Sequence, residues 1–198
     1  METEPIVVVP EGQELSTKTP PILKRFTETP LEREESSLDA NDAESKNIGP
    51  AGRHFNAGVE SLRRGEWAAS IAEFTKAIDL LPTYSPAWNN RGVARELSGD
   101  EEGALGDILA ALDASGDNSA AWNNRGLQLL RYRDFIGALQ AFDEAILLSP
   151  LYARPRFHCG LVRSYQGDLA GAVKDFQEAL RLDPTMEDAK RELEALLG

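Results

Sequence analysis

The chain has 198 residues, of which 21 are basic and 33 acidic, so its net charge is -12 at pH 7. This acidic excess repels phosphate backbones and anionic lipid, which disfavours nucleic acid and membrane surfaces as partners. The one cysteine, Cys159, excludes an internal disulfide bond and a cysteine-based metal cluster, and it is typical of a reducing compartment. No apolar stretch is long enough for a membrane span, and acidic residues stand where a targeting signal carries positive charge. We therefore expect a cytoplasmic protein.

Residues 1–50 are predicted to be a disordered, acidic N-terminal tail. They contain 11 acidic and 5 basic residues and show no helical periodicity. Two Thr-Pro dipeptides, Thr19-Pro20 and Thr29-Pro30, are compatible with proline-directed phosphorylation, and the segment 21–26 (Pro-Ile-Leu-Lys-Arg-Phe) is compatible with a docking motif. The alternative for each is an ordinary solvated linker.

A repeat of 34 residues begins near Ala51. Glycines recur at this interval, and so do three columns of small or bulky residues. The four columns are Gly58, Gly92, Gly126 and Gly160; Ser70, Ala104, Ala138 and Ala172; Phe74, Ile108, Phe142 and Phe176; and Ala77, Ala111, Ala145 and Ala179. Since this is the period of helix-turn-helix solenoids, the sequence predicts an all-α solenoid of four such repeats.

The columns of small residues predict close packing within each repeat. Glycine in a helix costs on the order of 1 kcal/mol relative to alanine, so four helical glycines make sense where two backbones approach closely. We expect the glycine of each first helix to face the serine or alanine column of the second helix.

Turn signals divide each repeat into two helices. Glycine followed by an acidic residue separates the helices in three repeats, with Arg133-Asp134 in the third, and proline follows three of the second helices. The predicted helices are 51–64, 67–81, 85–98, 101–115, 119–132, 135–149, 153–166, 169–183 and 186–197. The predicted units are the repeats 51–84, 85–118, 119–152 and 153–186, followed by a C-terminal capping helix in 187–198 with leucines on one side.

The sequences Trp88-Asn-Asn-Arg-Gly92 and Trp122-Asn-Asn-Arg-Gly126, followed by the alanine, aromatic and proline columns, resemble the tetratricopeptide repeat family across residues 51–198. Departures occur at His54 and Arg156 in the tryptophan column, and at Arg91 and Arg125 where the family usually has leucine. The resemblance implies a right-handed superhelix whose first helices line a concave groove. It also implies peptide binding or scaffolding as the general function.

The resemblance places a peptide-binding groove on the first helices. One predicted row is polar, a second is aliphatic, and three residues lie beside them. The residues are Asn56, Asn90, Asn124 and His158; Val59, Val93, Leu127 and Leu161; and Asn89, Asn123 and Phe157. Asparagine both donates and accepts hydrogen bonds, so the polar row suits the backbone of an extended peptide. The alternative is that these asparagines bind neighbouring helices.

Charge also favours an acidic partner, because the four first helices carry ten arginines and two glutamates. Asp107 is placed by the repeat between Arg91 and Arg125, so some arginines are expected in internal ion pairs. Arg63, Arg131 and Arg154 are the better candidates for the groove. The acidic tail is a candidate intramolecular occupant of the same face.

The predicted function is that of a non-enzymatic adaptor or scaffold that binds an extended, acidic segment of a protein partner. The sequence offers no catalytic constellation, no metal-ligand pattern and no phosphate loop, so we expect no metal and no cofactor. A self-assembling homo-oligomeric scaffold and a co-chaperone or assembly factor are the alternatives. The clamp that binds chaperone tails in one subgroup of the family is matched at Asn124 and Arg154, but Asn89, Val93 and His158 depart from it.

Overall fold

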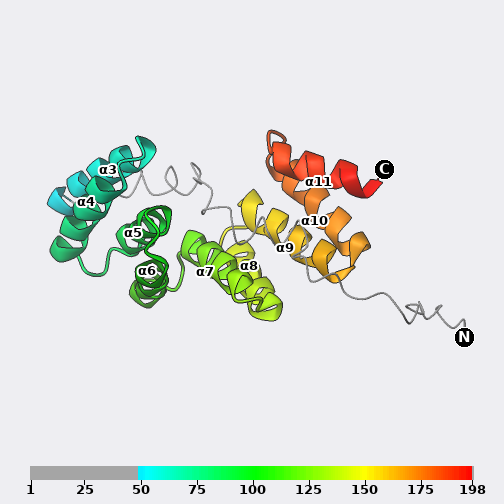
Figure 1. Ribbon diagram of the computed structural model, residues 1–198, viewed down its shortest axis with the longest axis horizontal. Coiled ribbons are helices and arrows are strands. Elements are labelled where there is room, and N and C mark those ends of the chain that lie inside the picture. Colours follow the sequence, from blue (N-terminus) through cyan, green and yellow to red (C-terminus); the bar gives the residue numbers. More distant parts are fainter. Residues whose placement is uncertain (1–48, 198) are drawn as a thin grey trace, which may run out of the picture.

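The computed structural model of the protein describes residues 49–197, which form nine α-helices joined by short turns (Figure 1). The helices are α3 (Gly49–Arg63), α4 (Trp67–Leu80), α5 (Ser85–Leu97), α6 (Glu101–Ala114), α7 (Ser119–Arg131), α8 (Phe135–Leu148), α9 (Ala153–Gln166), α10 (Leu169–Leu182) and α11 (Glu187–Leu197). Each lies within two residues of its predicted range. The predicted tail, with its Thr-Pro dipeptides and its 21–26 segment, lies outside the described residues, apart from the two residues that begin α3.

The helices pack as consecutive hairpins. The main contacts join α3 with α4, α5 with α6, α7 with α8 and α9 with α10, and α11 packs on α10. Figure 1 shows these hairpins following one another in chain order along the long axis. The prediction of an all-α solenoid is therefore confirmed.

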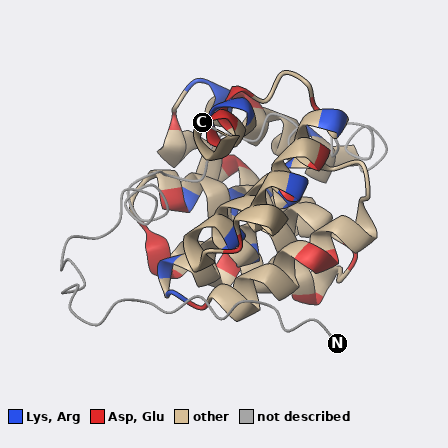
Figure 2. Ribbon diagram, turned by 90° about the vertical axis from the view of Figure 1, so that its right-hand side faces the viewer, with Lys and Arg blue, Asp and Glu red and all other residues tan. Residues whose placement is uncertain are grey.

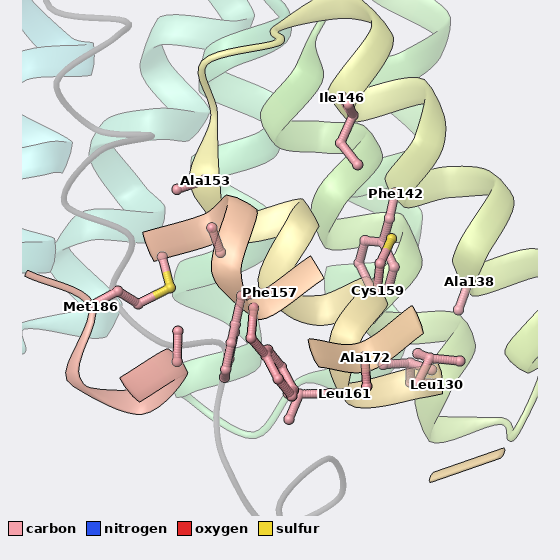
Figure 3. Close-up of a cluster of buried hydrophobic side chains, with 14 residues drawn as sticks. Leu130, Ala138, Phe142, Ile146, Ala153, Phe157, Cys159, Leu161, Ala172 and Met186 are labelled. Carbon is pink, nitrogen blue, oxygen red and sulfur yellow. The ribbon is translucent and has the colours of Figure 1, made fainter. Parts of the chain in front are cut away.

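The predicted columns form the core. The bulky column and both columns of small residues are at most 1 % exposed in all four repeats. Buried apolar residues of α3, α4 and α5, together with Tyr84, form a first core cluster, which includes Phe55, Val59 and Phe74. A second core cluster extends from Leu130 on α7 to Ala189 on α11 (Figure 3). Each second helix thus buries one face, as the 3.6-residue period requires, whereas most residues of α5 are buried.

In three of the four repeats the glycine of the first helix lies against an aromatic ring, whereas Gly92 lies against Ile108 and the backbone oxygen of Ala104. The prediction that these glycines face serine or alanine therefore holds only in part. A Cβ atom on Gly126 would lie 2.4 Å from Cε1 of Phe142, and one on Gly58 would lie 2.7 Å from the ring of Phe74. The neighbouring serine column contacts the glycine backbone instead, since Ser70 Oγ donates a 2.9 Å hydrogen bond to the carbonyl oxygen of Gly58. The ring of the second helix fills the space that the missing side chain leaves.

The turns between paired helices follow the predicted signals. The aspartates before three second helices accept 2.9 Å hydrogen bonds from backbone N–H groups in the first turn of the helix. They are Asp100, Asp134 and Asp168. Glu66, at the same position in the first repeat, makes no such bond. The residue before the acid is a glycine with positive φ in three repeats, whereas the third repeat has Arg133 at φ 59°.

Trp88 and Trp122 close the turns between repeats. Trp88 Nε1 donates to the carbonyl oxygen of Pro82 at 2.8 Å, and Trp122 Nε1 donates to that of Gly116 at 2.9 Å. Each indole therefore binds the backbone that ends the preceding repeat, which holds adjacent repeats together.

Candidate peptide-binding face

The predicted groove residues lie on α3, α5, α7 and α9, and we call this side of the solenoid the inner face. Each of these first helices contacts the next first helix directly. Asn56 is exposed, Leu127, Arg131 and Arg154 are half-buried, and the other predicted residues are buried. The buried ones are Val59, Asn89, Asn90, Val93, Asn123, Asn124, Phe157, His158 and Leu161.

The predicted aliphatic row belongs largely to the core. Val59 and Val93 are part of the first core cluster, and Leu161 is part of the second. Leu127 packs against both clusters. These side chains therefore hold the repeats together, and only the half-buried Leu127 retains substantial apolar surface.

The predicted polar residues form an amide row that crosses three first helices. Asn89 Nδ2 donates to Asn90 Oδ1 at 3.1 Å, and Asn124 Nδ2 donates to Asn89 Oδ1 at 2.9 Å. Asn123 Oδ1 lies 2.9 Å from His158 Nδ1, and since a carbonyl oxygen only accepts, Nδ1 carries the hydrogen. Asn89, Asn123 and Asn124 thus bind neighbouring helices, as the alternative reading of the sequence held, whereas Asn90 binds Asn89 of its own helix.

A spacing of 35 residues recurs in the polar contacts between first helices. Three side-chain hydrogen bonds join a residue of one first helix to the residue 35 positions later on the next. The pairs are Asn89 with Asn124, Asn123 with His158, and Glu96 with Arg131. The repeat supplies 34 of these positions, and the stagger of adjacent helices supplies one more.

The 35-residue spacing explains why two buried polar atoms lack hydrogen-bond partners. Asn90 Nδ2 and Gln128 Oε1 are both buried and have no partner among the described residues. Counting back 35 positions from Asn90 leads to Phe55, and counting back from Gln128 leads to Val93, and neither side chain can form a hydrogen bond. Neither polar group is therefore satisfied within the part of the chain that the structure describes.

Asp107 of α6 forms a buried ion pair with Arg91 of α5. Arg91 donates from Nε and Nη2 to its two carboxylate oxygens at 2.8 and 2.7 Å, and Arg95 Nη1 lies 2.8 Å from Oδ1. The prediction of an internal pair is right for Arg91 and wrong for Arg125. Arg95 takes the second place because it lies one helical turn after Arg91 on the same helix.

The predicted groove arginines differ in their surroundings. Arg131 pairs with Glu96, whose side chain is 2 % exposed, so its charge is largely neutralised within the protein. Arg63 is exposed and Arg154 is half-buried. Figure 2 shows acidic and basic positions interspersed over the described helices. The excess of arginine in the first helices is therefore partly balanced by internal carboxylates.

Burial, with a smaller effect from Arg154, lowers the pKa of His158 from 6.5 to about 3. The unfolded chain takes up a proton at this side chain near pH 6.5, whereas the folded chain does so only near pH 3. Stability is therefore lost as the pH falls through this window, by about 2 kcal/mol between pH 7 and pH 5. Urea unfolding at both pH values checks this prediction. His158→Asn keeps a donor at the position of Nδ1 for Asn123 and should lose about 2 kcal/mol less than the wild type. Equal losses in both proteins would contradict the prediction.

Two further side chains that could take part in chemistry are Cys159 and His54. Burial raises the pKa of the Cys159 thiol to about 12, so it is a protonated core residue. His54 Nδ1 lies 2.7 Å from Glu73 Oε2.

Within residues 49–197, no three histidine, cysteine or acidic side chains gather as metal ligands. No helix of the same residues has the length and apolar character to cross a bilayer.

Comparison with known proteins gives similarity in structure. No family model matches the chain, and no curated protein matches its sequence. PilF from Pseudomonas aeruginosa is 23% identical with a TM-score of 0.69, over 79% of this chain and 69% of PilF. YrrB, a tetratricopeptide repeat protein with an unusual peptide-binding site, is 20% identical with a TM-score of 0.57, over 82% of each chain. This chain has the tetratricopeptide-repeat fold. MamA is a further neighbour, 19% identical with a TM-score of 0.58, over 79% of this chain and 94% of MamA.

Within the tetratricopeptide-repeat fold, the structure adds polar residues that the sequence reasoning missed. Glu96 and Gln128 lie on first helices, and both are less than 8 % exposed. The 35-residue spacing between Glu96 and Arg131 is a signal in the sequence that could have revealed their contact. Thr75 was also missed, and its Oγ1 accepts a 3.1 Å hydrogen bond from Arg91 Nη1.

A pocket of about 230 Å³ lies where the C-terminal end of α7 meets the first turn and a half of α6. Its lining residues are Glu101, Leu105, Gln128, Arg131 and Tyr132. The tetratricopeptide-repeat fold creates this pocket between repeats, so neither repeat alone predicts it.

Proposed function

We propose that this protein is a non-enzymatic protein-interaction adaptor that binds an extended segment of a partner on its inner face. The amide row supports this proposal, because Asn90 Nδ2 is buried at its end without an acceptor. An unpaired buried donor costs about 1–3 kcal/mol, and a peptide carbonyl oxygen would remove that cost.

The amide row also gives a reason why the bound segment would be extended. Backbone N–H and C=O groups are free to bind side chains only where the segment is not helical. Hydrogen bonds from Asn124 and His158 fix the orientation of the row before any ligand arrives, so little side-chain entropy is lost on binding.

We further propose that the preferred segment is acidic and that the protein acts in the cytoplasm. Arg154 lies on the inner face close enough to His158 to affect its pKa, and Arg63 is exposed at the end of α3. The positive charges of these two arginines, on the first helices α3 and α9, support the proposed preference. A reducing compartment agrees with the buried free thiol of Cys159.

An affinity capture experiment with purified full-length protein tests the adaptor function. Asn90→Asp keeps an oxygen that accepts from Asn89 and replaces the unpaired donor with an acceptor that repels a peptide carbonyl oxygen. The loss of one hydrogen bond and the added repulsion should reduce partner recovery about tenfold, which corresponds to about 1.4 kcal/mol. Quantitative mass spectrometry of the captured proteins measures this reduction.

Gln140→Glu is the matched control, since it makes the same change of amide to carboxylate at an exposed position on α8. Circular dichroism has to show that both variants fold. If Asn90→Asp and Gln140→Glu recover the same partners in equal amounts, the inner face is not the binding site. The same capture with residues 1–48 deleted tests whether the acidic tail competes for this face, in which case recovery rises.

A further inference from the structure

The pocket between α6 and α7 has the character of a binding site for a single basic side chain. Its volume of about 230 Å³ is below the roughly 300–1,000 Å³ of pockets that hold drug-sized ligands. Gln128, which is 4 % exposed, lines the pocket, and its Oε1 has no hydrogen-bond partner among the described residues. An unpaired acceptor inside a pocket calls for a ligand that donates a hydrogen bond.

The other lining groups agree with an ammonium group as the ligand. The carboxylate of Glu101 supplies a negative charge and further acceptors, while Leu105 offers apolar contact for methylene groups. Arg131 also lines the pocket, but its guanidinium group is bonded to Glu96. The aromatic ring of Tyr132 adds a surface that attracts cations.

Apolar surface continues from the pocket along the turn of the third repeat. Tyr132 and Ile136 are 70 % and 71 % exposed, while the second repeat has Ser98 and Glu102 at the same positions. Arg133 between them adopts a positive φ that the other three repeats reserve for glycine. Its side chain donates a 3.2 Å hydrogen bond to Tyr165 of the next repeat. The site is thus a polar pocket beside an exposed apolar strip.

We propose that this site binds the chain's own segment 21–26, Pro-Ile-Leu-Lys-Arg-Phe, with the Lys24 ammonium group in the pocket. Of the five basic residues in 1–48, only Lys24 and Arg25 have apolar residues on both sides. These apolar neighbours, Leu23 and Phe26, cover the strip of Tyr132 and Ile136. The 22 residues from 27 to 48 span at most about 75 Å. Helix α7 is only two helix-to-helix steps from α3, by way of α5, and each step is about 10 Å. The pocket shares Arg131 with the inner face but contains no residue of the amide row, so this contact does not depend on the adaptor function.

Zero-length carbodiimide coupling of the full-length protein tests this proposal, because the reagent joins an amine to a carboxylate only when the two are in contact. Mass spectrometry should find a Lys24–Glu101 link about tenfold more often than a link from Lys24 to Glu144, which is exposed on the outer helix α8. This ratio corresponds to a preference of about 1.4 kcal/mol. Lys18, which lacks apolar neighbours, should link to Glu101 less often than Lys24 does.

Two further measurements identify the occupant and the site. In a mixture of isotopically light and heavy protein, links within one label support the chain's own segment, whereas links mainly between labels identify a second copy and overturn the proposal. Gln128→Leu keeps the size of the side chain but removes the acceptor, and it should reduce the Lys24–Glu101 link several-fold without changing the helical circular dichroism signal. The proposal also fails if Lys24 links to Glu101 no more often than Lys18 does.

Discussion

Gly126→Leu is expected to lower the free energy of unfolding by about 3 kcal/mol, the upper end of the usual cost of overpacking. Even the first added atom, Cβ, would lie 2.4 Å from Phe142 Cε1, and the Phe142 ring is itself 0 % exposed. The ring has no open space to enter, so α7 and α8 would have to move apart. Urea unfolding followed by circular dichroism measures the loss.

Gly106→Leu provides the matched control, because it makes the same substitution in a helix where the glycine is exposed and has no atom within 4 Å of an added Cβ. Leucine is the better helix former, so this variant should be more stable than the wild type by up to about 1 kcal/mol. If the two variants lose equal stability, contact with Phe142 is not the reason for glycine in this column.

Asp107→Ala is expected to lower the free energy of unfolding by about 3–5 kcal/mol, because it leaves a buried cation without a counter-ion. The side chains of Arg91 and Asp107 are 10 % and 3 % exposed, so water replaces the lost carboxylate only poorly. Arg95 loses the same partner. Chemical denaturation measures the change.

Two comparisons separate an uncompensated charge from a simple loss of contacts. The double variant Arg91→Met/Asp107→Leu removes both charges and should recover most of the stability, since buried pairs are often replaceable by apolar residues. Glu178→Ala breaks the exposed pair with Arg181 and should leave stability nearly unchanged. The double variant could instead be as unstable as Asp107→Ala. That result would show that the attraction within the ion pair stabilises the fold, and that the instability of Asp107→Ala does not come from leaving a buried arginine without a counter-ion.

The candidate binding face shows both the reach and the limit of sequence reasoning. The repeat placed the asparagines of α5 and α7 on one side of the solenoid, and the hydrogen bonds between Asn89 and Asn124 agree with that placement. It did not reveal that Asn90 alone keeps an unused donor. That difference depends on Phe55 in the preceding repeat and on a stagger of one residue between neighbouring helices.

The sequence by itself determined the helices, their order and their buried faces. These features depend on local periodicity, on N-caps such as Asp100 and on glycine turns such as Gly99, and each is encoded within a few residues. Only the tertiary structure decided that Gly126 faces Phe142, that Arg95 rather than Arg125 shares Asp107, and that a pocket opens beside Gln128. Contacts of this kind depend on the rotation and offset of helices far apart in the chain, which are fixed when all their side chains pack together.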